Sequence, residues 1–521
     1  MKRVLSVAAL VAASCPFIEL VQADEWNVAV GGNPARNGQS LEVGPGSPTI
    51  LWEGSRSGIV AQQGVIGEGL VIVNRITSFT IPTGTWIVAH ELETGVERWA
   101  IQLPMNFSDS WRSRVTGVRD GQVYASRSGN TNAEYLYALD PADGSIIWQS
   151  DALITETSTE SVTFAPNGDI ITTGQSTLVR IDRTDGSTVW STSRTCPTSG
   201  GCDASVFGDR VYIWEAGANG PVVTAIDLDT GARLYSSAGI GGGFIQQLGL
   251  FVGPDGTVYA PRSQNNVLTD FIVALDDTGS ALVERWRTPI GFMPFASHGV
   301  APDGSGVFSY TTDRTVEEMQ VMKLDPSTGA IIDESPILPT SNVAPSPRLA
   351  VDADGKLYLT NGGFPNGELF CLTPELDILW RDPVPNVNVG GPALGPNGAL
   401  LVCGVGTDVR VYRDAPELRL FGPEPGVAGA RNTLLVTGGA IGEPVYFGYG
   451  FRAGVTNVPG CPGVVLDIDR PTLAGTAITG IDGDALLDAF VPASASGRRI
   501  LLQAVERESC LVTPLVDFIF P

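Results

Sequence analysis

The sequence predicts an all-β protein in two parts, an eight-bladed β-propeller followed by a small β-sandwich, and three observations lead to this prediction. The chain has 521 residues with 63 glycines and 36 prolines, and few stretches place apolar residues at helical spacing. A strand–turn–strand unit recurs through most of the chain. Beyond residue 415 the recurrence stops, while short apolar runs continue. Short strands joined by turns, in a chain too long for one core, favour this organisation.

The recurring unit consists of an apolar strand, a tight turn and an aromatic residue on the returning strand. In its clearest copy the recognisable positions are Ala138, Asp140, Gly144 and Trp148. Aspartate accepts hydrogen bonds from turn amides, and glycine adopts the left-handed conformation that closes the hairpin. We therefore interpret these positions as turn and packing residues, not as calcium ligands. The other copies contribute Trp52, Trp99, Gly186, Trp190, Gly231, Tyr235, Trp286 and Trp380.

The number of times that the aromatic position recurs gives the number of blades. This position falls at 52, 99, 148, 190, 235, 286, 333 and 380, and a second-strand signal also occurs eight times. Trp52 precedes any inner strand, whereas the strands near 389–413 have no outer strand after them. We therefore expect residues 49–54 to supply that outer strand. Each blade then has four antiparallel strands, and the N-terminal strand closes the ring over residues 24–415.

The N-terminus has the features of an export signal. Lys2 and Arg3 precede an apolar run, and small residues end at Ala23. Residues 1–23 are therefore predicted to be a signal peptide that is removed, which leaves a secreted, periplasmic or cell-surface protein. A lipoprotein anchored through Cys15 is the alternative. No later apolar run approaches the roughly 18 residues of a membrane span.

The cysteines fit an exported chain. If Cys15 leaves with the signal, six remain: Cys196, Cys202, Cys371, Cys403, Cys461 and Cys510. An even number in an exported protein indicates three disulfides, although six cysteines allow 15 pairings. Proximity in sequence favours joining the first two and the last two, which leaves the middle two as a pair between neighbouring blades.

Composition limits the partners. The formal net charge is −24, which disfavours nucleic acid and anionic membranes as partners. We expect a monomer that binds a protein or a carbohydrate.

Candidate ligand-binding residues are few. Propeller geometry places Arg114, His298 and Arg348 on innermost strands near the central channel, where they could hold an anion such as a carboxylate or a sugar acid. The alternative is that they pair with channel aspartates or backbone carbonyls. The chain has no Gly-x-Ser-x-Gly elbow, no phosphate-binding loop and only two histidines, so no catalytic residue and no metal ligand is predicted.

The repeat resembles a known family. The spacing of Ala138, Asp140, Gly144 and Trp148 is similar to the tryptophan-docking motif of the pyrroloquinoline quinone (PQQ)-type eight-bladed propellers, and residues 33–38 are similar to their entry segment. The resemblance covers roughly residues 25–415. It implies the propeller fold but not one activity, because the superfamily includes PQQ-dependent alcohol dehydrogenases, outer-membrane assembly lipoproteins and scaffold proteins.

The enzymes of that family set a test for function. The resemblance implies a vicinal Cys-Cys pair, a calcium site and a catalytic aspartate in a dehydrogenase, whereas this chain has no Cys-Cys pair and no residue that can be matched to the calcium ligands. We therefore predict no cofactor and favour a non-enzymatic scaffold for binding or protein interaction. The alternative is a PQQ-dependent or other oxidoreductase, with PQQ and calcium in the propeller funnel.

The C-terminal part is predicted to be separate. Residues 416–430 are rich in Pro, Gly and Ala and indicate a linker. Residues 431–521 contain several short strand signals together with Cys461 and Cys510, which favours a disulfide-pinned, immunoglobulin-like β-sandwich. The acidic run from Asp482 to Asp488 is interpreted as a turn rather than a calcium site.

Overall fold

The computed structural model confirms that the protein is all-β. It describes residues 26–59, 63–77, 84–105, 112–128, 134–155, 162–174, 176–196, 203–241, 244–245, 249–263, 270–291, 296–313, 315–340, 346–362, 366–385, 387, 390–414, 417–440, 442–480 and 483–521. Within them the only helical elements are two 3-10 turns, Pro396–Gly398 and Ala493–Ala495. The predicted signal peptide, Cys15, Cys202 and Asp482 lie outside this set. No helix of the described part is long and apolar enough to cross a membrane.

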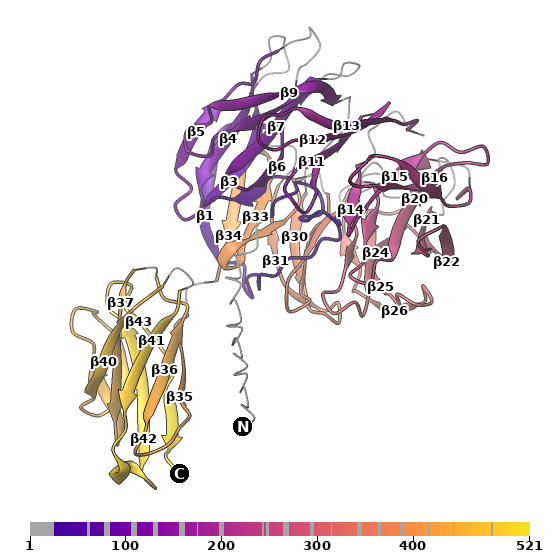
Figure 1. Cartoon of the computed structure of the whole chain (residues 1–521). Coiled ribbons are helices and arrows are strands. Elements are labelled where there is room, and N and C mark those ends of the chain that lie inside the picture. Colours follow the sequence, from indigo (N-terminus) through magenta and orange to yellow (C-terminus); the bar gives the residue numbers. More distant parts are fainter. Residues whose placement is uncertain are drawn as a thin grey trace, which may run out of the picture. The chain divides into compact units, whose positions relative to one another are not determined.

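The chain divides into two compact units, Met1–Arg413 and Asp414–Pro521. The first unit is a β-propeller of antiparallel sheets that follow one another around a common centre (Figure 1). Its first three separate sheets are β6 (Arg112–Arg119), β7 (Gln122–Ser128), β8 (Glu134–Leu139) and β9 (Ile146–Thr155); β10 (Thr163–Phe164), β11 (Ile170–Thr173), β12 (Thr177–Ile181) and β13 (Thr188–Ser193); and β14 (Ser205–Phe207), β15 (Arg210–Glu215), β16 (Val222–Asp227) and β17 (Arg233–Ser236).

Three further sheets continue the series with the same strand order. They are β18 (Phe244–Ile245), β19 (Phe251–Val252), β20 (Val258–Ser263), β21 (Asp270–Asp277) and β22 (Leu282–Ile290); β23 (Gly299–Val300), β24 (Val307–Asp313), β25 (Glu318–Leu324), β26 (Ile331–Glu334) and β27 (Leu338–Pro339); and β28 (Arg348–Val351), β29 (Leu357–Thr360), β30 (Glu368–Leu372) and β31 (Ile378–Pro383).

The remaining strands of this unit form one eight-stranded sheet. Its members are β32 (Ala393–Gly395), β33 (Ala399–Cys403), β34 (Val405–Tyr412), β1 (Ile50–Ile59), β2 (Val65–Gly67), β3 (Leu70–Ile76), β4 (Thr85–Glu91) and β5 (Glu97–Ile101). β1 pairs with β34 along most of its length, with Trp52 opposite Val411, whereas a single residue pair joins β1 to β3. The expected pairing of an N-terminal strand with the last strands of the propeller is therefore present, and Figure 1 shows indigo β1 beside orange β34.

Hydrophobic clusters and hydrogen bonds link neighbouring sheets. Trp99 on β5 donates from Nε1 to the carbonyl oxygen of Pro141 in the next sheet, at 2.8 Å. A Cβ on Gly144 of that same turn would lie 2.8 Å from the indole ring of Trp99. Within the eight-stranded sheet, Trp52 donates in the same way to the carbonyl of Leu92. Between separate sheets, equivalent bonds run from Trp148 to Arg183, Trp190 to Leu228 and Trp286 to Pro326. The aromatic position of the repeat therefore locks each of these sheets to its successor.

The second unit contains two antiparallel sheets and a hairpin. They are β35 (Arg419–Glu424), β36 (Arg431–Thr437) and β41 (Ala485–Phe490); β40 (Thr472–Ile478), β37 (Pro444–Gly450), β42 (Arg499–Glu506), β43 (Leu511–Val512) and β44 (Val516–Ile519); and the hairpin β38 (Ala453–Asn457) and β39 (Val465–Ile468). Residues of both sheets, including Val436 and Phe447, share one buried cluster. The predicted linker 416–430 is wrong in part, because Leu418 and Leu420 are buried in that cluster and residues 419–424 form β35.

The cysteines only partly follow the sequence-based pairing. Cys461 and Cys510 form the expected disulfide. The pairing of Cys371 with Cys403 is wrong, because no disulfide joins them and both side chains pack in the same buried cluster. Burial raises the pKa of the Cys403 thiol to about 12. The pairing of Cys196 stays a prediction, since Cys202 lies outside the described residues.

Candidate functional site

The N-terminal segment, residues 26–45, runs across the first strands of successive sheets. Its residues bond in order to β2, β6, β10, β14, β19, β23 and β28. For example, the amide of Val206 donates to the carbonyl of Pro34 at 2.8 Å, and the amide of Val351 donates to the carbonyl of Gly38 at 2.7 Å. One short stretch of backbone therefore ties together strands that are far apart in the sequence.

Arg36 anchors this segment. Its side chain is almost fully buried, and its Nε donates to the carbonyl of Ala204 at 2.6 Å. The two terminal nitrogens donate to the carbonyls of Val30 and Val162 at 3.0 and 3.2 Å, and Nη1 lies 3.4 Å from the carboxylate of Asp203. A guanidinium offers five donors in a fixed plane, so a single side chain can hold three separate segments.

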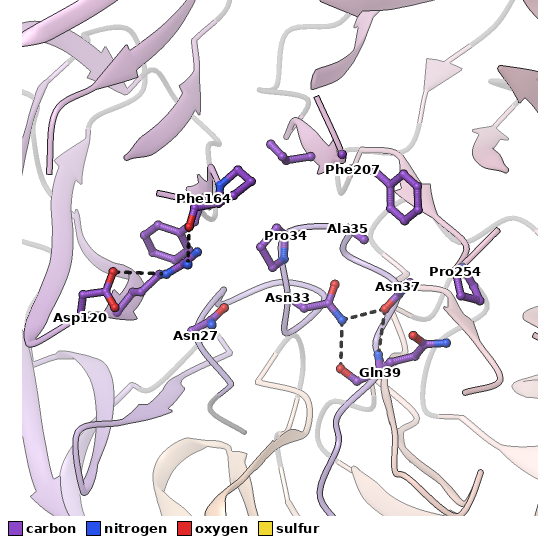
Figure 2. A pocket seen from close by; sticks show the side chains of 14 residues that line it. Asn27, Asn33, Pro34, Ala35, Asn37, Gln39, Asp120, Phe164, Phe207 and Pro254 are labelled. Carbon is purple, nitrogen blue, oxygen red and sulfur yellow. Dashed lines mark hydrogen bonds and ion pairs between the residues drawn. The ribbon is translucent and has the colours of Figure 1, made fainter. Parts of the chain in front are cut away.

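Amide side chains on both sides of Arg36 hold the turn formed by residues 33–39 (Figure 2). Asn33 donates from Nδ2 to Asn37 Oδ1 at 2.7 Å and to the carbonyl of Gln39 at 3.0 Å. Asn37 donates to the carbonyl of Val252 at 3.0 Å, and Gln39 donates to the carbonyl of Ala301 at 2.9 Å. These bonds fix the amide orientations, because each Nδ2 or Nε2 faces an oxygen.

This turn forms one side of an open cavity of about 770 Å³, which we call the bowl. Its volume lies in the range of small-molecule sites. The N-terminal segment contributes Asn27, Asn33, Pro34, Ala35, Asn37 and Gln39. The propeller sheets contribute Arg119, Asp120, Phe164, Pro166, Val206, Phe207, Gly208 and Pro254, so amides, rings and one pair of opposite charges line the bowl (Figure 2).

The charged groups of the bowl are compensated within the protein. Arg119 donates to the carbonyls of Ala165 and Pro166, each at 3.2 Å, and its Nε lies 3.5 Å from Asp120. Asp120 also accepts from Arg183 at 3.0 Å. The bowl therefore offers shape, amides and aromatic faces rather than a strong net charge.

The three residues predicted to face the channel lie in different sheets. Arg114 is on β6, Arg348 is on β28 and His298 directly precedes β23, and all three are buried. None of them lines the bowl. His298 stacks on Phe251, with ring centroids 5.7 Å apart, and burial lowers the pKa of its imidazole to about 3. The imidazole is therefore neutral and packed at physiological pH.

Sequence reasoning singled out residues 33–38 without predicting a cavity beside them. The signal was available, since two amide side chains and an arginine lie in this stretch together with Pro34 and Gly38. In the described residues no group of three or more His, Cys, Asp or Glu side chains is placed to hold a metal ion.

Comparison with known proteins agrees with the repeat. Residues 83–335 match the family model described as outer membrane protein assembly factor BamB, which is built on PQQ repeats. This match is consistent with the resemblance of the repeat to the PQQ-like propellers. No curated protein matches the chain.

Solved structures that resemble the chain include several that align at low sequence identity. The Dos1 propeller aligns at 13% identity over 70% of this chain and 94% of its own, with a TM-score of 0.46. Saccharomyces cerevisiae Sqt1 aligns at 11% identity over 70% of this chain and 100% of its own, with a TM-score of 0.44. Kuenenia stuttgartiensis hydrazine synthase aligns at 14% identity over 60% of this chain and 99% of its own, with a TM-score of 0.42. These alignments carry no argument about function.

Proposed function

We propose that the protein is an exported, non-enzymatic scaffold whose propeller binds a protein or carbohydrate ligand in the bowl. The observation that carries this proposal is the construction of the bowl. Its N-terminal side is held by backbone bonds to successive sheets and by the buried Arg36. A concave site that is formed before the ligand arrives loses little conformational freedom on binding, which favours recognition.

The finer architecture belongs to the same proposal. Six separate sheets and the two four-strand sets of the eight-stranded sheet support a ring of eight blades. β1 is then the closing strand, and a propeller leaves only short, protected sheet edges, so we expect a monomer. In the second unit, two sheets over one cluster support a β-sandwich.

Export is supported by the Cys461–Cys510 disulfide, which suggests an oxidising extracellular or periplasmic environment. We propose cleavage of the signal peptide after Ala23. The intact mass of the protein purified from the producing cells tests this directly. A mature chain that begins at Asp24 supports cleavage there, whereas a lipid-modified chain that begins at Cys15 supports the lipoprotein alternative.

The binding role is tested with a variant that narrows the bowl. Pro254 is an exposed residue on its rim, and Pro254→Trp adds bulk without removing a hydrogen bond. Immobilised wild-type protein is expected to retain an envelope component, offered as separate protein and polysaccharide fractions, that the variant retains at least tenfold more weakly. Equal retention by both proteins, with equal melting temperatures, would contradict a ligand site in the bowl.

The resemblance of the repeat to the PQQ-type propellers keeps an oxidoreductase as the second candidate, although the family model that matches is that of an assembly factor. We expect PQQ and calcium to leave the melting temperature unchanged and to give no saturable quinone absorbance band in a titration. A saturable band together with stabilisation would overturn the scaffold proposal and favour a quinoprotein.

A further inference from the structure

The second unit has a cavity of about 470 Å³, which we call the C-terminal cavity. It is lined by strands of the five-stranded sheet and by the β38–β39 hairpin. Tyr446 on β37 and Val505 on β42 are paired on neighbouring strands, and both belong to its lining. Thr456 and Leu466, which are paired across the hairpin, are also part of the lining.

Two arginines reach this cavity from different elements. Arg470 lies in the turn between β39 and β40, and Arg507 directly follows β42. The guanidinium of Arg507 lies over the ring of Tyr446, 5.8 Å from its centroid. A cation over an aromatic face is held in place without losing its charge. The cavity therefore has one positioned guanidinium and a second arginine in its lining.

The lining of the cavity contains no aspartate or glutamate. Within the described residues neither Arg470 nor Arg507 forms an ion pair, although both are exposed. Arg431, Arg452 and Arg498 of the same unit form no ion pair either, whereas many other arginines of the described residues pair with acids. Examples are Arg98 with Glu91 at 2.6 Å and Arg180 with Asp169 at 2.8 Å. Asp469 and Glu508 are neighbours of the two arginines in sequence but are not part of the lining.

The rest of the lining decides what kind of anion fits. Asn457 and Thr472 bring polar side chains, and Leu473, Pro459 and Pro471 bring apolar surface. A bare phosphate or sulfate would use the arginines but not the apolar walls. A sugar ring with a carboxylate would use both, because guanidinium groups bind carboxylates in a two-point fork and the C–H faces of a sugar ring pack on apolar side chains.

We propose that the C-terminal cavity binds a carboxylated sugar, such as the uronic acid of an acidic polysaccharide. Arg470 and Arg507 hold the carboxylate, and Tyr446 with Leu473 contacts the ring. The Cys461–Cys510 disulfide supports the site, because Val458, Cys461 and Val505 share a buried cluster next to it. This inference does not depend on the bowl.

The test measures binding of trigalacturonate, the probe, to the full mature chain by isothermal titration calorimetry. We expect saturable binding by the wild type. Arg470→Gln and Arg507→Gln should each weaken it at least tenfold, because a charge-assisted hydrogen bond is lost. Arg452→Gln is the matched control, since Arg452 is an exposed arginine of the same unit that does not line the cavity. It should change the affinity less than twofold.

Further probes separate the sources of the anion. Inorganic phosphate and an aspartate-rich peptide, each titrated under the same conditions, should bind at least tenfold more weakly than trigalacturonate. Tighter binding of the peptide or of phosphate would overturn the assignment to a carboxylated sugar. Failure of the wild type to bind trigalacturonate, or equal binding by the Arg470→Gln/Arg507→Gln double variant, would overturn the proposal while leaving the retention assay of the bowl unaffected.

Discussion

Gly144 is required for two physical reasons, its backbone conformation and the lack of space for a side chain. Its φ is +75°, and a Cβ there would lie 2.8 Å from the indole of Trp99. Gly121 is its natural control, because its φ is +74° but a Cβ there would meet nothing within 4 Å. The two glycines therefore share the backbone demand, and only Gly144 also needs the space.

The difference sets the expected magnitudes. An alanine forced into the left-handed region costs about 1–2 kcal/mol, so Gly121→Ala should lower the free energy of unfolding by that amount. Gly144→Ala must also displace Trp99, which adds about 1–3 kcal/mol of overpacking. Trp99→Ala, which removes a buried indole, should cost about 3–5 kcal/mol. In the Trp99→Ala background, Gly144→Ala should again cost only about 1–2 kcal/mol.

The assay is urea unfolding of the full chain, followed by tryptophan fluorescence for the propeller transition. The double-mutant cycle should give a coupling energy of about 1–3 kcal/mol between Gly144 and Trp99. Two results would refute the reasoning. One is additive effects in the cycle, and the other is an equal loss of stability in Gly121→Ala and Gly144→Ala.

Three further predictions concern stability. Arg36→Ala should destabilise the propeller by about 3–5 kcal/mol in urea unfolding, because it breaks a buried ionic and hydrogen-bonded group. Arg36→Lys should recover only part of that lost stability. An unchanged unfolding midpoint for Arg36→Ala would contradict the anchoring role. The folded pKa of His298 is about 3 against 6.5 for the free side chain, so the unfolded chain binds the proton first and stability falls as pH drops from 6.5 towards 3. The full loss amounts to roughly 4–5 kcal/mol. His298→Phe should lose less stability over that pH window. Identical pH profiles of stability for the two proteins would contradict the role of His298. Cys461→Ser with Cys510→Ser opens a loop of sequence separation 49 and should destabilise the second unit by about 4 kcal/mol, with no shift in the calorimetric transition of the first unit.

The sequence-based prediction succeeded where residue type reports local geometry. Gly144 and Trp148 mark a turn and a packing position in any sheet, so their spacing showed the repeat without knowledge of the neighbours. The pairing of the N-terminal strand with the last strands of the propeller followed from the order of the repeat signals, because Trp52 stands before any inner strand. In the structure the same residue lies opposite Val411 on β34.

The bowl was not predictable in the same way. Its N-terminal side is fixed by bonds to backbone carbonyls, such as those of Ala204 and Val252. Every residue has a carbonyl, so the sequence does not show which ones converge until the sheets are arranged around a centre. Cys371 and Cys403 show the same limit, since pairing by elimination ignored that both are buried as packing residues.

The linings of the two cavities show that the net charge of −24 does not by itself exclude anionic ligands. That charge acts over the whole molecule, but salt at physiological strength screens charges beyond about 8 Å. Within a cavity, the nearest groups decide what is attracted. In the bowl, Arg119 is held by Asp120 and two carbonyls, whereas the lining of the C-terminal cavity contains Arg470 and Arg507 and no acid. An acidic protein can therefore repel long polyanions such as nucleic acid and still hold a single carboxylate at one local site.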